Sequence, residues 1–259
     1  MASFDDVPDP SNAFVVSHRM KPVLIIRTGR APAPIRARHG DFPHWFRLGA
    51  QLSPDRIRVI DVEAGEELPA PSEVAGALIT GSAAMVTERA PWSERTAGWI
   101  RDAMDEELPM FGVCYGHQLM SHALGGRVDY LPGGREIGTV SLNVLDAAKN
   151  DPLASALPLQ FRAHATHEQS VLELPKGTTV LVSSTRDPHH LVRYGKNAMS
   201  AQFHPEFNAD VMRAYIHRKQ HDMKREGFDP HHTFKQVAAT PLARRLFRQF
   251  SRHHGLATG

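Results

Sequence analysis

The fold is decided by the stretch Phe111-Gly112-Val113-Cys114-Tyr115-Gly116-His117-Gln118, which holds the only cysteine in 259 residues. The apolar run that leads into it, 107–113, is typical of a buried strand. Residues 117–124 follow and stop at two glycines, which indicates a short helix. The sequence therefore predicts a strand, a sharp turn and a helix, with the cysteine in the turn.

The pattern Gly-x-Cys-x-Gly at such a turn is the nucleophile-elbow arrangement, with sulfur in place of a serine oxygen. We expect Gly112 and Gly116 to let the backbone turn sharply. The helix would direct its positive end at the sulfur of Cys114 and favour the thiolate. The alternative is that Cys114 is simply a small, buried apolar residue. The flanking glycines favour the nucleophile.

Composition limits the class of protein. The apolar content of 41% is enough for a proper core, and a net charge of +2 does not by itself imply a nucleic-acid partner. A single cysteine excludes a disulfide framework and fits a reducing compartment. We find no signal peptide at the N-terminus and no apolar run that approaches a membrane span, so we expect a cytoplasmic protein.

Strands and helices alternate in the first half of the chain, which predicts an α/β fold with a mostly parallel sheet covered on both faces. Strands are expected at 22–27, 57–62, 75–80 and 107–113, helices from Asp41 and over 93–105, and a loop over 30–38. In such sheets the chemistry lies beyond the carboxyl ends of the strands. Gly81, Ser82 and Cys114 all fall at such ends.

The second half changes character. Strands expected at 139–144, 159–162 and 178–182 indicate a small antiparallel extension, and 198–203 returns to the core. Asn208 is expected to cap a helix, and Thr240 a last helix that carries four arginines. We divide the chain into a loose arm over 1–20, one main domain over 21–225, and a helical C-terminal extension over 226–259 packed on the same domain.

A cysteine nucleophile needs a base, and the base needs a group that orients it. His204-Pro205-Glu206 offers both, because the proline keeps the preceding residue extended and positions i and i+2 then project to one side. Oxyanion donors are expected from the amide of Tyr115, next after the nucleophile, and from Gly81. The alternative for Gly81 is an ordinary turn glycine.

These residues resemble a known family. Segments 112–118 and 202–206 together resemble the class I, triad-type glutamine amidotransferases, and most of all the glutaminase domain of GMP synthetase. Residues 165–175 resemble that domain's Ser-His-x-Asp-x-Val segment, and 135–138 its Glu-Tyr-Gly stretch. The resemblance spans about residues 75–207.

The resemblance implies a flavodoxin-like sheet and release of ammonia from the glutamine side chain through a γ-glutamyl thioester. It implies a triad and a set of substrate contacts. The sequence itself carries no cofactor motif, and we expect no cofactor or metal. The triad would be Cys114, His204 and Glu206, and the substrate contacts Gln118, Ser82, His167 and Glu136.

Two features depart from the family. The run Thr80-Gly81-Ser82-Ala83 replaces the usual two glycines and a proline, and no glycine-rich nucleotide loop follows Glu206. We therefore expect a stand-alone amidotransferase-like protein, which either feeds a separate synthetase or acts as a free hydrolase.

Two other functions stay open. The same triad could hydrolyse a γ-glutamyl peptide or conjugate instead of glutamine. A non-catalytic regulatory or nucleic-acid-binding module would use the arginines of the last helix, although four arginines are a weak electrostatic footprint. His217 and His221 are spaced for a shared metal but lack a carboxylate between them, and His189-His190 is expected at the surface.

Overall fold

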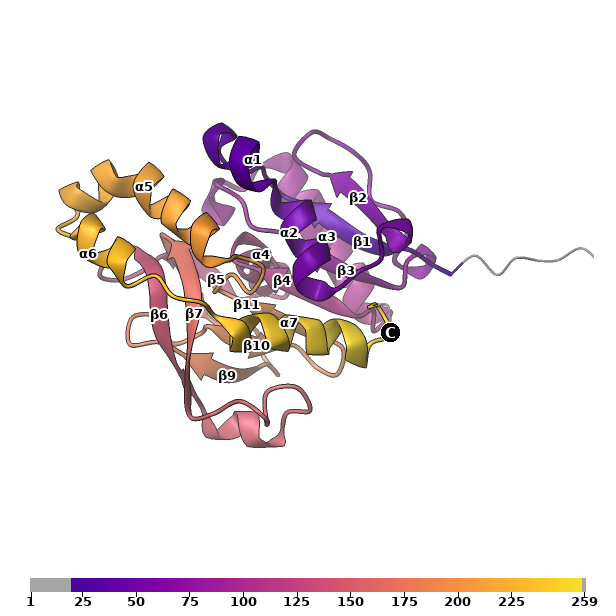
Figure 1. Ribbon diagram of the computed structural model, residues 1–259. Helices are drawn as coiled ribbons and strands as arrows, with labels where there is room; N and C mark the ends of the chain where they lie inside the picture. Colours follow the sequence, from indigo (N-terminus) through magenta and orange to yellow (C-terminus); the bar gives the residue numbers. More distant parts are fainter. Residues whose placement is uncertain (1–19, 258–259) are drawn as a thin grey trace, which may run out of the picture.

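The computed structural model describes residues 20–257 and is shown in Figure 1. All but the last residue of the arm expected at 1–20 lie outside the described residues. Nine strands form the main sheet, in the order β2-β1-β3-β4-β11-β10-β9-β6-β7. The neighbours from β2 to β11 pair in parallel, and those from β11 to β7 pair antiparallel. The expected parallel sheet with an antiparallel extension is confirmed.

The strand bounds are β1 (Val23–Arg27), β2 (Ile57–Asp61), β3 (Gly76–Ile79), β4 (Met110–Val113), β5 (Arg127–Tyr130), β6 (Glu136–Val144), β7 (Gln160–His167), β8 (Gln169–Glu173), β9 (Thr179–Ser183), β10 (Leu191–Arg193) and β11 (Ala198–Ala201). Of these, β5 and β8 form a separate two-stranded sheet. The helices are α1 (Ala33–His39), α2 (Phe42–Ala50), α3 (Pro91–Asp105), α4 (Tyr115–Ala123), α5 (Ala209–Arg225), α6 (Pro230–Lys235) and α7 (Pro241–His253).

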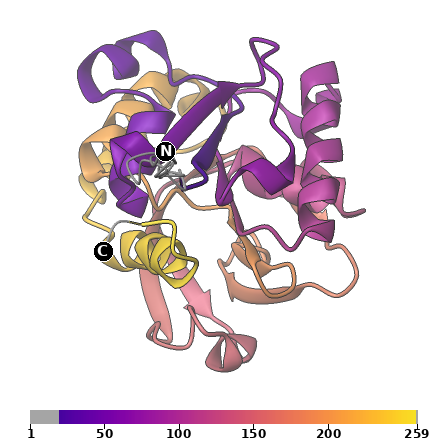
Figure 2. The ribbon, with the colours of Figure 1, turned by 90° about the vertical axis from the view of Figure 1, so that its right-hand side faces the viewer.

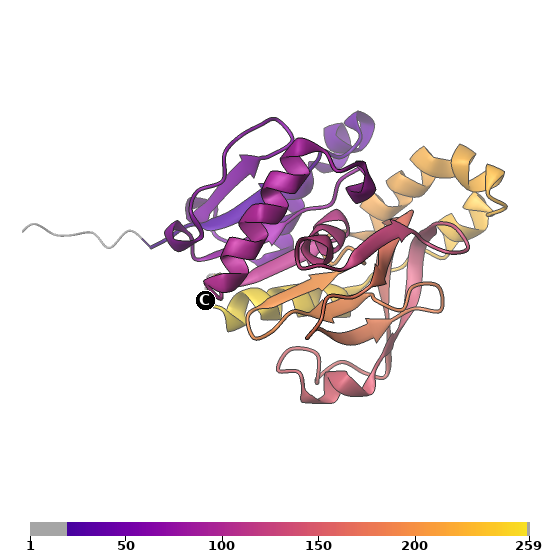
Figure 3. The ribbon, with the colours of Figure 1, turned by 180° about the vertical axis from the view of Figure 1, so that it is seen from behind.

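Alternate side chains of the central strands supply two separate cores. Ile25 of β1 belongs to a core with Phe46 of α2 and Phe247 of α7, whereas Ile26 faces Ile100 of α3 on the other side. Figure 2 shows α2 and α7 on one side of the sheet and α3 on the other. Seen from behind, α3 and α4 lie in front of the sheet and α7 behind it (Figure 3).

The last helix, α7, belongs to the same core as Ile25 and Phe46. Phe247 and Phe250 contact Phe111 of β4, with ring centroids 5.0 and 5.1 Å apart, so α7 supports the strand that leads to the cysteine. Its apolar side is buried, as expected. No helix in the described part of the chain is both long and apolar enough to cross a membrane.

Local signals located most elements correctly. The side chains of Asp41 and Asn208 accept hydrogen bonds from Phe42 and Val211, as expected for helix caps. The loop expected over 30–38 is wrong, because α1 lies there. Its Pro34 falls in the first helical turn, where proline is tolerated, and Ile35 is buried in the core.

Candidate active site

The cysteine lies at a strained turn between β4 and α4. Cys114 has φ 53° and ψ −100°, a conformation that a residue with a side chain rarely adopts. The expected sharp turn is therefore present, but the positive φ falls on the cysteine and not on either neighbouring glycine. Such strain persists only where the surrounding structure enforces it.

The glycines serve close approach. A Cβ on Gly112 would lie 2.5 Å from the carbonyl oxygen of Gly116, and one on Gly116 would lie 2.5 Å from that of Ile79. Because backbone atoms cannot move aside, β3, β4 and α4 meet only if both positions lack a side chain. This contact fixes the start of α4 beneath the sulfur.

Sheet pairing brings His204 to the cysteine. Strands β4 and β11 are parallel neighbours, with Val113 opposite Ala201, so the residues after both strands leave the sheet together. The amide of Cys114 donates to the carbonyl of Ala201 at 2.8 Å. His204 follows three residues later and lines the same cavity as Cys114.

Glu206 orients the imidazole. Nδ1 of His204 lies 2.7 Å from Oε1 of Glu206, and both side chains are buried. Nε2 of His204 has no well-aligned hydrogen bond to any described residue, so it remains available to the thiol. Phe207 stacks on the ring at a centroid distance of 4.1 Å. The two-residue spacing thus produces the contact that the sequence predicts.

The electrostatics favour a thiolate–imidazolium pair. Burial alone would raise the pKa of the Cys114 thiol, but the adjacent charge of His204 holds that pKa below its ordinary value. Burial opposes the charge on His204 too, yet Glu206 and Cys114 raise its pKa to about 10. Cys114 also occupies the N-cap position of α4, where the helix dipole favours negative charge.

The two residues expected to donate to the oxyanion, Tyr115 and Gly81, lie next to this pair. Tyr115 is the first residue of α4, so its amide has no partner within the helix. A Cβ added to Gly81 would lie 3.1 Å from Cε1 of His204, which places this glycine directly against the imidazole. The role of both amides as oxyanion donors stays a prediction.

A cavity of about 140 Å³ opens at Cys114 and His204. Of the four expected substrate contacts, Ser82, Gln118 and His167 line it and Glu136 does not. The amide nitrogen of Gln118 already donates to Gln169 at 2.7 Å and to Gln202 at 3.0 Å. Three basic residues, Arg30, Arg218 and Lys219, also line the cavity, and sequence reasoning missed them.

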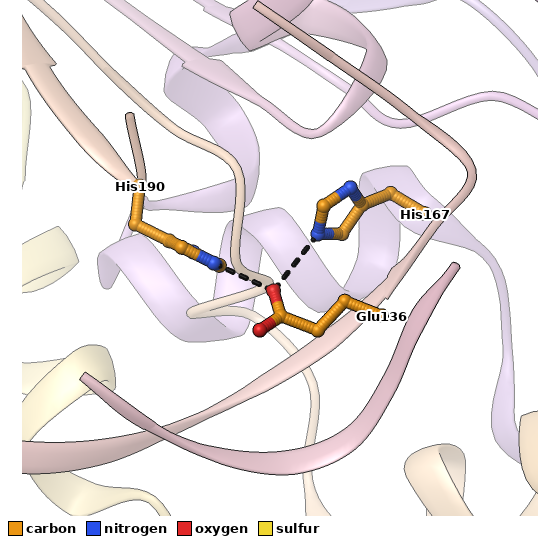
Figure 4. Close-up of side chains that lie close together, drawn as sticks. All are labelled: Glu136, His167 and His190. Carbon is orange, nitrogen blue, oxygen red and sulfur yellow. Dashed lines mark hydrogen bonds and ion pairs between the residues drawn. The ribbon is translucent and has the colours of Figure 1, made fainter. Parts of the chain in front are cut away.

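Glu136 lies behind His167, in a buried cluster shown in Figure 4. Its Oε2 lies 3.1 Å from Nε2 of His167 and 2.7 Å from Nε2 of His190, and Ser184 donates to its Oε1 at 2.7 Å. The expectation that His190 is at the surface is wrong: it is fully buried, because β10 carries it into the sheet. Only the neighbouring apolar residues Leu191 and Val192 signalled that burial.

Glu136, His167 and His190 could in principle hold a metal ion. Within residues 20–257, they are the only group of three or more His, Cys, Asp or Glu side chains whose potential metal-ligand atoms all lie within 4.8 Å of one another. The distances between their nitrogens and the carboxylate oxygen are those of hydrogen bonds, so a buried ion pair describes the cluster as it stands. His217 and His221 are not part of it.

Comparison with known proteins defines the class. The family model for class-I glutamine amidotransferases matches residues 51–222, which include both the cysteine turn and the His-Pro-Glu segment. The chain therefore belongs to this family. The helices α6 and α7 lie outside the matched segment.

Two kinds of relatives are similar to the chain. One is γ-glutamyl peptidase 5 of Arabidopsis thaliana, 29% identical over 63% of this chain and 66% of the peptidase. Another is a subunit of the glutamine-hydrolyzing GMP synthase of Methanopyrus kandleri, 33% identical over 65% of this chain and 85% of that protein. The chain thus spans just under two-thirds of the length of the plant peptidase.

Solved structures agree on the fold. A glutamine amidotransferase from Thermotoga maritima superimposes with a TM-score of 0.70 at 20% identity, covering 90% of this chain and 98% of that one. A second, from Methylobacillus flagellatus, also gives 0.70 at 20% identity, covering 92% and 96%. At this level of identity the likeness shows the flavodoxin-like fold alone.

Proposed function

We propose that this protein is a cysteine-dependent hydrolase that releases ammonia from the side chain of glutamine. The observation that carries the proposal is that Cys114 and His204 line one cavity and that Glu206 contacts the imidazole of His204 from behind. Each residue supplies what the others lack: a nucleophile, a base and a group that orients the base.

In the first half of the reaction, the Cys114 thiolate attacks the γ-carbonyl carbon of glutamine. The amides of Tyr115 and Gly81 stabilise the negative oxygen that forms. The His204 imidazolium then gives its Nε2 proton to the departing nitrogen, so ammonia leaves and a γ-glutamyl thioester remains on Cys114.

In the second half, neutral His204 takes a proton from a water molecule, whose oxygen attacks the thioester carbonyl. The carbon–sulfur bond breaks, glutamate leaves, and the thiolate–imidazolium pair is restored. Glu206 stays ionised throughout and keeps Nδ1 of His204 protonated.

The test is ammonia release from glutamine by the purified chain and by its Cys114→Ala variant. We expect release by the first and none by the second, with unchanged thermal unfolding as the control for folding. If the chain releases no ammonia, alone or with synthetase proteins, the proposal is wrong.

A second candidate function changes the substrate and keeps the triad. Hydrolysis of γ-glutamyl peptides is favoured by the basic side chains of Arg30, Arg218 and Lys219 in the cavity lining, which suit a leaving group with a carboxylate. The similarity to plant proteins named γ-glutamyl peptidases supports it as well. Rates on γ-glutamyl dipeptides and on glutamine decide, and dipeptides that react no faster than glutamine rule this version out.

A separate synthetase partner remains part of the leading proposal, supported by the similarity to GMP synthase proteins. A cytoplasmic location is likewise a proposal, supported by the single cysteine. The nucleic-acid alternative is the weakest, because Arg244 of the last helix is half-buried and donates to the carbonyl of Glu206 at 3.2 Å.

A further inference from the structure

A second carboxylate–imidazole pair lies beside the cysteine. Glu136 begins β6 and His167 ends β7, and the two residues are direct partners in the antiparallel pairing of these strands. Both side chains are buried (Figure 4). The proposed mechanism does not use this pair, although His167 lines the same cavity as Cys114.

The hydrogen bonds of His167 determine its charge. Nδ1 lies 2.9 Å from the carbonyl oxygen of Gln169, and Nε2 lies 3.1 Å from the carboxylate of Glu136. Both neighbours are acceptors, and a neutral imidazole has only one N–H. His167 can satisfy both contacts only as an imidazolium, which donates from each nitrogen.

His190 provides an internal contrast. Its Nε2 lies 2.7 Å from the same oxygen of Glu136, but its Nδ1 has no hydrogen-bond partner among the described residues. A neutral ring satisfies that geometry. With Ser184, the carboxylate of Glu136 has three donors around it, which stabilise its negative charge.

The charge on His167 acts on the cysteine. The sulfur of Cys114 lies 3.9 Å from the carbonyl oxygen of Thr166, the residue before His167. Burial would lower the pKa of His167, but Glu136, Asp187 and Cys114 raise it above its ordinary value. The positive charge of His167 in turn lowers the pKa of the Cys114 thiol.

The other titratable groups around His167 come from different elements. His117 of α4 is buried, with its pKa lowered to about 3, so it stays neutral. His190 of β10 shares Glu136, and Asp187 in the loop before β10 accepts a hydrogen bond from Ser170. Of the ionisable groups named here, Glu136 is the one whose side chain contacts the imidazole of His167 directly.

We propose that His167 is a permanent imidazolium, held in that state by Glu136, and that it stabilises the Cys114 thiolate as a second cation beside His204. The significance of this role rests on the proposed function, in which Cys114 is the nucleophile. His204 exchanges its proton during each cycle, whereas His167 keeps both of its protons. Glu136 thereby acts as a positioning residue, without touching the substrate.

The test is the pH dependence of Cys114 alkylation by iodoacetamide, followed by intact-protein mass spectrometry. In Glu136→Gln and in His167→Gln we expect the acidic midpoint of the profile to rise by about one pH unit, because one nearby stabilising charge is lost. Glu94→Gln is the matched control: it changes a carboxylate that faces His122, at the far end of α4, and should leave the profile unchanged. If either variant is folded and its midpoint does not rise, the proposal is overturned.

A measurement on the unaltered chain covers the case in which these variants fail to fold. Nitrogen-15 NMR of the histidine rings should show His167 with both nitrogens protonated at pH 7.5, about one unit above the ordinary pKa of histidine, and a neutral ring at that pH contradicts the proposal. Neither readout requires turnover. Unchanged alkylation profiles with intact ammonia release would therefore refute this inference alone, whereas the expected profiles without hydrolysis of any γ-glutamyl substrate would refute the proposed function.

Discussion

Two buried carboxylate–imidazole pairs flank Cys114, and they are built in different ways. His204 and Glu206 belong to one tripeptide after β11, and their contact of 2.7 Å follows from local backbone geometry. Glu136 and His167 are far apart in the sequence and meet only through the register of β6 and β7. One pair is local and the other is produced by the antiparallel sheet.

The difference in construction matches a difference in role. His204 has one nitrogen on Glu206 and the other without a well-aligned partner, as a group that moves protons requires. His167 has acceptors at both nitrogens, so its protons are fixed. A proton-transfer group and a fixed charge can thus be distinguished by their hydrogen bonds.

The largest effect is expected from the local pair. His204→Asn removes the base and the proton donor, and we expect hydrolysis to fall by about 10⁴-fold. Steady-state rates of ammonia release measure this. A loss of less than about tenfold would mean that another group acts as the base.

Glu206→Gln should have the next largest effect. The ring of His204 would lose the charge that favours its imidazolium, and a loss of about 10²-fold to 10³-fold in kcat is expected. Glu94→Gln makes the same chemical change at a surface pair and should retain the parent rate. Equal rates in both variants would remove Glu206 from the mechanism.

The pH profile of hydrolysis tests the raised pKa of His204. Leaving-group protonation requires the His204 imidazolium, whose pKa is raised to about 10. Activity should therefore hold at moderately alkaline pH and fall about tenfold per pH unit above pH 10. A fall that begins near pH 7, measured as kcat, would contradict the raised pKa.

Glu136→Gln should have the smallest effect on catalysis. We expect a loss of about tenfold in kcat/KM, equal to about one pKa unit of thiolate stabilisation. The free energy of unfolding, measured with urea, should fall by about 3 kcal/mol, because a buried charge loses its partner. A catalytic loss as large as that of Glu206→Gln would break the distinction between the two pairs.

The local pair was predictable from sequence, and so was the turn that carries the cysteine. Strand, glycine and proline signals lie within a few residues of Cys114 and His204, and parallel strand ends meet at one edge of a sheet. The reason for the glycines was not predictable. Gly112 and Gly116 are required by close contacts with the backbone of α4 and of β3, while the strained φ falls on Cys114.

The second pair could not be predicted because it depends on register. A shift of one residue between β6 and β7 would turn Glu136 or His167 to the other face. His190 illustrates the same limit, since its polar neighbours suggested a surface loop and β10 has only three residues. The helix α1 was missed because proline in a first helical turn was interpreted as a loop.

The central claim is that one sulfur is activated for attack on a γ-glutamyl carbonyl. The most direct measurement is intact-mass and peptide analysis after incubation with 6-diazo-5-oxo-norleucine, a glutamine mimic that alkylates activated thiols. We predict a single adduct on Cys114, formed rapidly by the parent chain and at least about 10²-fold more slowly by His204→Asn. No adduct, or one that forms equally fast in both proteins, would contradict the account.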